Sequence, residues 1–161
     1  MSKHPPYYLQ NFTQSESNHP DFSDEKVYRR SKKTEPATIF EDLSRNDLLN
    51  GISVNRSKLS GKPEDVLWLG EEERDEQGNY KFEYKEGFNV FEADYVELQN
   101  SIWFRFAVQY APLVHNVAHC NIICLETETF SELTNKERKE ALRNIKAGLA
   151  SLFRLVSDQS Q

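Results

Sequence analysis

The segment from Ile102 to Leu125 is the longest apolar stretch of this 161-residue chain, and it limits what the chain can fold into more than any other segment. Between residues 103 and 109, apolar side chains at even positions alternate with a mixed set at odd positions, and a period of two predicts a β-strand. Pro112 has no backbone N–H, so this strand must end there or run along a sheet edge. The following run, residues 117–125, carries apolar residues on both faces. This predicts a strand covered on both sides and leaves a short buried helix as the alternative.

A long amphipathic helix is predicted in the C-terminal part of the chain. Residues 134–137 read Thr-Asn-Lys-Glu, a capping box in which the threonine hydroxyl and the glutamate carboxylate each accept a hydrogen bond from a backbone N–H. After it, apolar residues recur every three or four positions: Leu142, Ile145, Leu149, Leu152, Phe153 and Val156. An apolar stripe of this kind must be buried, so we expect the helix to cover a sheet or a partner.

Shorter patterns predict the remaining elements. Strands are expected at residues 25–30, 51–56, 80–84 and 88–91, and helices at residues 38–50 and 63–69, the second ending at Gly70. The acidic segment 71–79 is predicted to be a solvated loop, and residues 92–98 favour a helix over a strand. Mixed strands and short helices followed by one long helix predict an α+β fold, with a mixed or antiparallel sheet packed by the C-terminal helix.

The first 24 residues differ in composition from the rest. Residues 1–24 are rich in Pro, Ser, Asn, Gln and His and show no periodicity. Such a segment buries too little apolar surface to offset its ordering entropy, so we expect a disordered polar tail followed by a single domain at residues 25–157. Tyr7, Tyr8 and Phe12 form an aromatic cluster in this tail, which could dock on its own domain or on a partner.

Charge and hydropathy exclude several classes of protein. A net charge of −6 argues against broad nucleic-acid binding, because that affinity comes from Lys and Arg neutralising phosphates. No run reaches the roughly 18 to 20 apolar residues of a membrane span, and the first residues lack the apolar core of a secretory signal, so we expect a soluble cytoplasmic protein. In that reducing compartment, Cys120 and Cys124 are expected to be buried free thiols.

The densest group of potential metal ligands is His115, His119, Cys120 and Cys124. On a helix, His115 and His119 would share one face and could bind zinc. Their spacing matches no zinc signature, so we interpret the four as core side chains and expect no metal. Gly-rich phosphate loops and the common hydrolase motifs are absent, so no cofactor is predicted.

A second group of residues lies on predicted strands and at a strand end: Arg29, Arg30, Ser53, Glu126 and Glu128. It resembles the Arg, Ser and Glu-x-Glu arrangement of ADP-ribosyltransferases. The resemblance implies an enzyme that uses NAD, in which the arginine holds the dinucleotide phosphates, the serine orients the site and the last glutamate binds the ribose hydroxyl. The family's second strand usually reads Ser-Thr-Ser, whereas residues 53–55 of this chain are Ser-Val-Asn.

Two short motifs lie in the middle of the chain: Gly-Ile-Ser-Val-Asn-Arg at residues 51–56 and, after Pro112, Asn-Val-Ala-His at residues 116–119. They resemble a loose group of small uncharacterised bacterial proteins found in mobile or defence-related gene neighbourhoods, and this implies a bacterial source but no activity. With the missing catalytic motifs, the leading hypothesis is a non-catalytic interaction or accessory module whose partner is another protein. An ADP-ribosyltransferase-like enzyme and a metal-binding domain are the alternatives.

Overall fold

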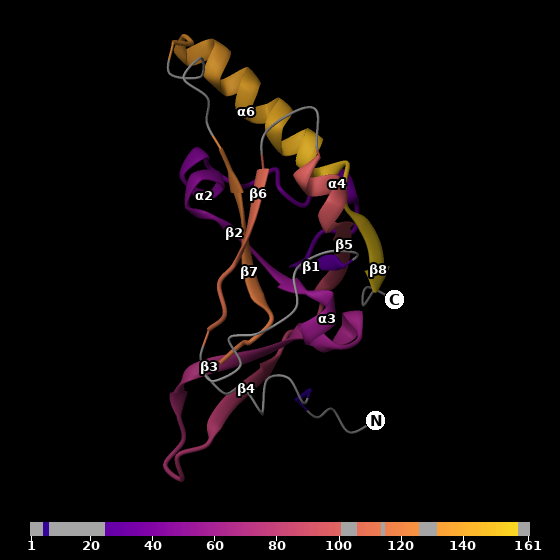
Figure 1. Cartoon of the computed structure of the whole chain (residues 1–161), viewed down its shortest axis with the longest axis vertical. Helices are drawn as coiled ribbons and strands as arrows, with labels where there is room; N and C mark the ends of the chain where they lie inside the picture. Colours follow the sequence, from indigo (N-terminus) through magenta and orange to yellow (C-terminus); the bar gives the residue numbers. More distant parts are fainter. Residues whose placement is uncertain (1–4, 7–24, 101–105, 114, 126–131, 158–161) are drawn as a thin grey trace.

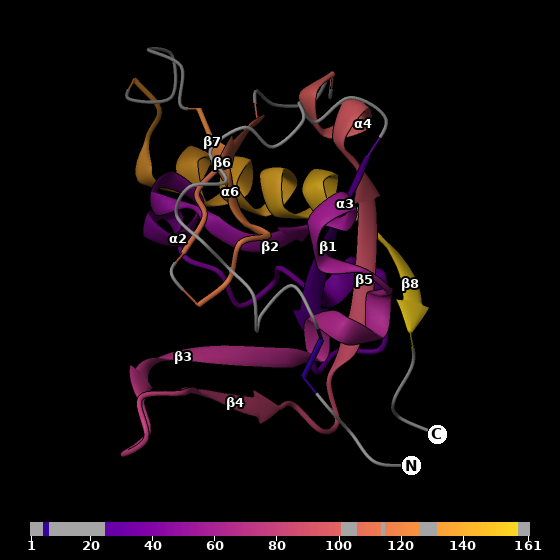
Figure 2. The same ribbon diagram turned by 60° about the horizontal axis from the view of Figure 1, so that its bottom comes forward.

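The structure is a computed structural model, and it describes residues 5–6, 25–100, 106–113, 115–125 and 132–157. These residues form the predicted α+β fold, with a six-stranded antiparallel sheet in the order β6-β7-β2-β1-β5-β8 (Figure 1). Its strands are β1 (Lys26–Ser31), β2 (Ile52–Arg56), β5 (Asn89–Asp94), β6 (Phe106–Tyr110), β7 (His119–Cys124) and β8 (Arg154–Ser157). The long helix α6 (Asn135–Ala150) packs against one face of the sheet (Figure 2).

The other elements are shorter. Strands β3 (Trp68–Arg74) and β4 (Tyr80–Tyr84) form a separate two-stranded ribbon at the end of the molecule opposite α6 (Figure 1). The connecting helices are η1 (Pro36–Thr38), α2 (Arg45–Asn50), α3 (Ser57–Ser60), η2 (Pro63–Leu67) and α4 (Tyr95–Gln99), of which η1 and η2 are 3₁₀ helices. None of the described helices is long and apolar enough to cross a membrane.

The main core lies between the sheet and α6. Successive side chains of a strand point to opposite faces, so each strand sends every second residue towards the helix. Along β7 the buried residues are Cys120, Ile122 and Cys124, and they alternate with half-buried ones. Ile145 and Leu149 of α6 close the core from the other side. The predicted strand is therefore confirmed and the helical alternative was wrong, but the second face of the strand is half-buried rather than fully covered.

The opposite face of the sheet is covered only in part. Helix η2 packs a second, smaller cluster against β1 and β5, formed by Tyr28, Val66, Leu67 and Val90. On β2 and β6 the same face carries the exposed side chains of Ser53 and Gln109. A polar part of the sheet surface thus remains open to solvent beside the smaller core.

The start of the helix predicted at residues 63–69 is confirmed, but its end at Gly70 and the loop predicted after it were wrong. The 3₁₀ helix η2 ends at Leu67, and β3 then runs through Gly70 to Arg74, where a helix stop and a solvated loop were expected. A Cβ atom at Gly70 would lie 2.4 Å from the backbone oxygen of His115, so glycine is required by a close approach of two backbones rather than by a helix end. Pairing with β4 orders the first half of the acidic segment.

The predicted helix at residues 38–50 is also shorter than expected. Only its end is right, because α2 begins at Arg45, after an unpredicted capping box between Ser44 and Asp47. Residues 92–98 divide between the two predicted possibilities, since β5 extends to Asp94 and α4 follows it.

The capping box of the long helix is confirmed, but the helix ends earlier than predicted. Glu137 N donates to Thr134 Oγ1 at 3.2 Å, and Thr134 N donates to Glu137 Oε1 at 3.1 Å. The helix stops at Ala150, and the chain turns back so that β8 pairs with β5. Phe153 directly follows that turn and packs edge-on against Phe40, with ring centroids 5.2 Å apart.

The predicted N-terminal tail lies almost entirely outside the described residues. Of residues 1–24, the structure describes only Pro5 and Pro6. The aromatic cluster of Tyr7, Tyr8 and Phe12 is therefore not placed, and its proposed docking role stays a prediction.

Candidate functional site

A hollow opens where β1 and β2 stop pairing. The ladder between these strands contains only the pairs Val27–Arg56 and Tyr28–Asn55, whereas β1 pairs with β5 along its whole length. Beside the end of the short ladder lies a hollow of about 40 Å³, which we call the β1–β2 cleft. Its lining residues are Tyr28, Arg29, Arg30, Ser53, Val54, Asn55 and His119. Arginine, serine, asparagine and histidine account for five of these seven residues, so the cleft is a polar site.

Arg29 brings a positive charge to the cleft. Its Nη1 donates to the backbone oxygen of Ser53 at 2.8 Å, which ties β1 to β2 beyond their ladder. The guanidinium lies 5.9 Å from the ring centroid of Phe40, and its Nε is buried without a hydrogen-bond partner among the described residues. Burial lowers the pKa of Arg29, and the nearby Asp47 opposes this shift, but an arginine remains charged. Within the described part of the chain, no carboxylate forms an ion pair with it.

Ser53 and His119 meet on the polar face of the sheet. In the β2–β7 ladder Ser53 is paired with Asn121 and Asn55 with His119, so Ser53 and His119 are diagonal neighbours. The Nδ1 atom of His119 lies 2.7 Å from the backbone oxygen of Ala111, and its Nε2 lies 3.2 Å from Ser53 Oγ. A carbonyl oxygen can only accept, so Nδ1 carries the proton in the neutral imidazole. Nε2 is then an acceptor, and the Ser53 hydroxyl donates to it.

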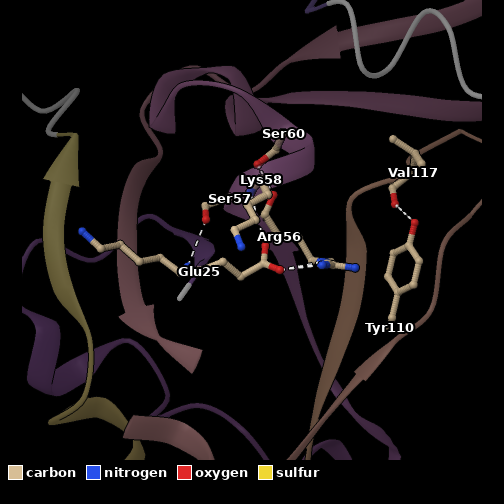
Figure 3. Close-up of polar contacts among 8 residues, drawn as sticks. Glu25, Arg56, Ser57, Lys58, Ser60, Tyr110 and Val117 are labelled. Atoms are coloured by element: carbon tan, nitrogen blue, oxygen red, sulfur yellow. Dashed lines mark hydrogen bonds and ion pairs between the residues drawn. The ribbon is translucent and has the colours of Figure 1, made fainter. Parts of the chain in front are cut away.

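Behind the cleft, the next residue of β2 enters a buried ion pair. Arg56 Nε and Nη2 both donate to Glu25 Oε1, at 3.0 and 2.5 Å, and the two side chains are 2% and 0% exposed (Figure 3). Glu25 Oε2 also accepts from the backbone N–H of Lys58 at 3.3 Å. The guanidinium carbon of Arg56 lies 4.8 Å from the ring centroid of Tyr110. Neither the glutamate nor this pairing was predicted from the sequence.

A second buried contact joins the two short sequence motifs. Asn116 Nδ2 donates to Asn55 Oδ1 at 2.8 Å, and Asn116 Oδ1 accepts from the backbone N–H of Ala118 at 3.1 Å. The backbone N–H of Arg56 in turn donates to Ala118 O at 2.8 Å, and the hydroxyl of Tyr110 donates to Val117 O at 2.7 Å (Figure 3). Residues 51–56 and 116–119 therefore form one hydrogen-bonded unit, which holds His119 in place beside Ser53.

The structure brings together three of the five residues that resemble an ADP-ribosyltransferase site. Arg29, Arg30 and Ser53 all line the β1–β2 cleft. Glu126 and Glu128 lie outside the described residues, so their relation to the cleft is not established. The side chain at position 55, where the family usually has a second serine, is buried and bonded to Asn116.

The four potential metal ligands do not converge. Cys120 and Cys124 point into the core as buried free thiols, whereas His119 lies on the opposite face of β7. His115 precedes the strand, and its Nδ1 is buried without a hydrogen-bond partner among the described residues. No three His, Cys, Asp or Glu side chains of the described chain are grouped so that they could hold a metal ion.

Burial makes Cys120 an unreactive thiol. Removal from water raises the pKa of Cys120 to about 12, an effect opposed by the nearby charge of Arg56 and reinforced by Glu25. Folding raises the pKa of this thiol above the value of about 8.5 that a cysteine has in the unfolded chain. Its contribution to the free energy of unfolding is therefore fully present below about pH 8.5. That stability is lost as pH rises from there to about 12.

We therefore expect the stability of the wild type to fall above pH 9 more steeply than that of Cys120→Ala. The denaturant midpoint of both proteins, measured from pH 7 to 11, checks this expectation. A native protein whose Cys120 reacts rapidly with a thiol reagent at pH 8 would contradict it.

No family model, curated protein or solved structure matches the chain, so comparison with other proteins assigns neither a family nor a function. The function proposed below therefore rests on the geometry of the β1–β2 cleft.

Proposed function

We propose that this protein is an interaction or accessory module that binds a protein partner at the β1–β2 cleft, with a carboxylate of the partner as the anchoring group. The observation that carries this proposal is Arg29, a half-buried guanidinium that makes one hydrogen bond and no ion pair among the described residues. A charged group removed from water gains most when an opposite charge joins it, and a guanidinium binds a carboxylate through two parallel hydrogen bonds.

The size and position of the cleft favour a carboxylate. A water-sized atom needs about 10 to 15 Å³ of such space. The hollow of about 40 Å³ therefore has room for about three water-sized groups, enough for the carboxylate of a side chain. Ser53 is exposed, so a side chain from a partner can approach the cleft from solvent. The resemblance to small bacterial proteins of mobile or defence-related neighbourhoods favours a role in such a system.

The proposal is tested with a small carboxylate probe. We expect N-acetyl-aspartate, added to the isotope-labelled full chain, to shift the NMR signals of Ser53 and His119, and the neutral N-acetyl-asparagine to leave them in place. Arg29→Met should weaken this binding by about 10- to 100-fold, because a hydrogen bond to a charged group contributes about 1.5 to 3 kcal/mol. Arg74→Met is the matched control, since Arg74 contacts Tyr80 on the distant ribbon.

Two results would reject carboxylate binding at this site. The first is an equal response to the charged and the neutral probe, and the second is unchanged affinity in Arg29→Met with the fold intact by circular dichroism.

One observation favours the enzyme alternative, namely the contact of 2.8 Å between Arg29 Nη1 and Ser53 O within a single cleft. An ADP-ribosyltransferase-like activity also needs the glutamate pair that follows β7. NAD turnover by the purified protein, abolished by Glu128→Gln, would replace the binding proposal with that enzyme.

A further inference from the structure

The Ser53 hydroxyl has the surroundings of an activated nucleophile. A serine becomes nucleophilic when a neutral imidazole accepts its proton and a third group holds that imidazole in the right tautomer. Here His119 Nε2 lies 3.2 Å from Ser53 Oγ, and the Ala111 carbonyl, 2.7 Å from Nδ1, fixes the tautomer. The backbone carbonyl thus does the orienting that an aspartate does in most serine hydrolases.

Neighbouring strands hold the two side chains in this geometry. Ser53 lies within β2, and His119 is the first residue of β7, its strand partner. The backbone N–H of Ala111 also donates to His119 O at 3.1 Å, so Ala111 contacts both the backbone and the ring of the histidine. Side chains on paired strands keep a reactive geometry better than side chains on loops.

Positive charge lies beside this pair, but Arg29 and Ser53 extend from opposite faces of the sheet. Arg29 pairs with Phe91 of β5, and its guanidinium lies 5.9 Å from the ring centroid of Phe40, so it extends on the face of the main core. From that face it donates to the backbone oxygen of Ser53 at 2.8 Å. Nucleophile, base and orienting group therefore occur at one place, and Arg30 is the cation that lines the cleft on the Ser53 face.

We infer that Ser53 is a catalytic nucleophile and His119 its general base, and that the β1–β2 cleft hydrolyses activated esters of short carboxylic acids. Ser53 Oγ attacks the ester carbonyl carbon, and its proton passes to His119 Nε2. The bond from that carbon to the alcohol oxygen breaks, and the imidazolium returns the proton to the departing alcohol. Water, with His119 again accepting a proton, then cleaves the acyl-serine to release a carboxylic acid and restore the hydroxyl.

The size of the cleft sets the substrate class. About 40 Å³ accommodates a small acyl group such as acetyl. This inference rests on the same cleft as the proposed binding function and adds a reaction to it. The acid that the reaction releases is a carboxylate, the group that Arg29 would bind in that proposal.

A covalent probe tests the inference on the full chain. We expect a fluorophosphonate to form one adduct, placed on Ser53 by mass spectrometry, and p-nitrophenyl acetate to acetylate the same residue. His119→Gln should slow both reactions by about 10²- to 10⁴-fold, the usual contribution of a general base. Ser53→Ala should abolish the adduct, whereas Ser151→Ala, at another exposed serine, should leave it unchanged.

Binding and reaction are tested with different variants. The adduct is measured in Ser53→Ala and the binding of N-acetyl-aspartate in Arg29→Met, so the failure of one proposal does not decide the other. His119→Asn, measured alongside His119→Gln, covers the case in which one of them fails to fold. An adduct on another residue, no adduct, or labelling of Ser53 at the wild-type rate in a folded His119 variant would overturn the inference.

Discussion

Arg56→Met is expected to lower the free energy of unfolding by about 3 to 5 kcal/mol, because it leaves the Glu25 carboxylate buried without its partner. Both side chains are almost fully inaccessible to solvent, at 2% for Arg56 and 0% for Glu25. After the substitution, the carboxylate keeps only the backbone N–H of Lys58 among the contacts described above. Chemical denaturation monitored by circular dichroism measures this loss.

The loss caused by Arg56→Met does not mean that the intact ion pair stabilises the fold. A double variant distinguishes the cost of breaking the pair from the net contribution of the pair. Taking two charges out of water costs about as much as their attraction returns, so an apolar pair of similar volume is often neutral or stabilising. Glu25→Met combined with Arg56→Met should therefore recover most of the stability that Arg56→Met loses. Additive losses from the two single substitutions would show instead that the ion pair is a net source of stability.

The buried arginine also shows where reasoning from the sequence stops. Ile52 and Val54 predicted which face of β2 is apolar, and that face is indeed buried. The same alternation assigns Arg56 to the core, which was the available signal for a buried ion pair. Its partner, Glu25, lies 31 residues away in an acidic chain and could be identified only once the strands were paired.

Local patterns predicted the elements that depend on local interactions. The capping box at Thr134 and the strand at residues 80–84 are both confirmed, because neighbouring residues determine them. Predictions failed where a distant segment decides the structure. Gly70 lies in a strand that approaches the His115 backbone, and Phe153 fits a helical period but follows a turn that returns the chain to β5.

The candidate site could be predicted only as separate parts. Ser53 was identified through an ADP-ribosyltransferase resemblance and His119 through a possible metal cluster, and 66 residues separate them. The β2–β7 register brings them together, and a shift of one residue would turn His119 to the other face of the sheet. Because register depends on the whole sheet, no local pattern could have shown that these two side chains meet.

Leu149→Ala is expected to lower the free energy of unfolding by about 2 to 5 kcal/mol, the range for removing a buried leucine. Leu149 is fully buried and lies in the core between α6 and the sheet, together with Ile145 and Phe153. Alanine leaves a cavity that the surrounding strands can close only in part, and it keeps helix propensity high, so the loss reports packing. Leu125→Ala is the matched control, because Leu125 is 46% exposed and should cost far less. Equal denaturant midpoints for the two variants would mean that α6 does not pack on the sheet in solution.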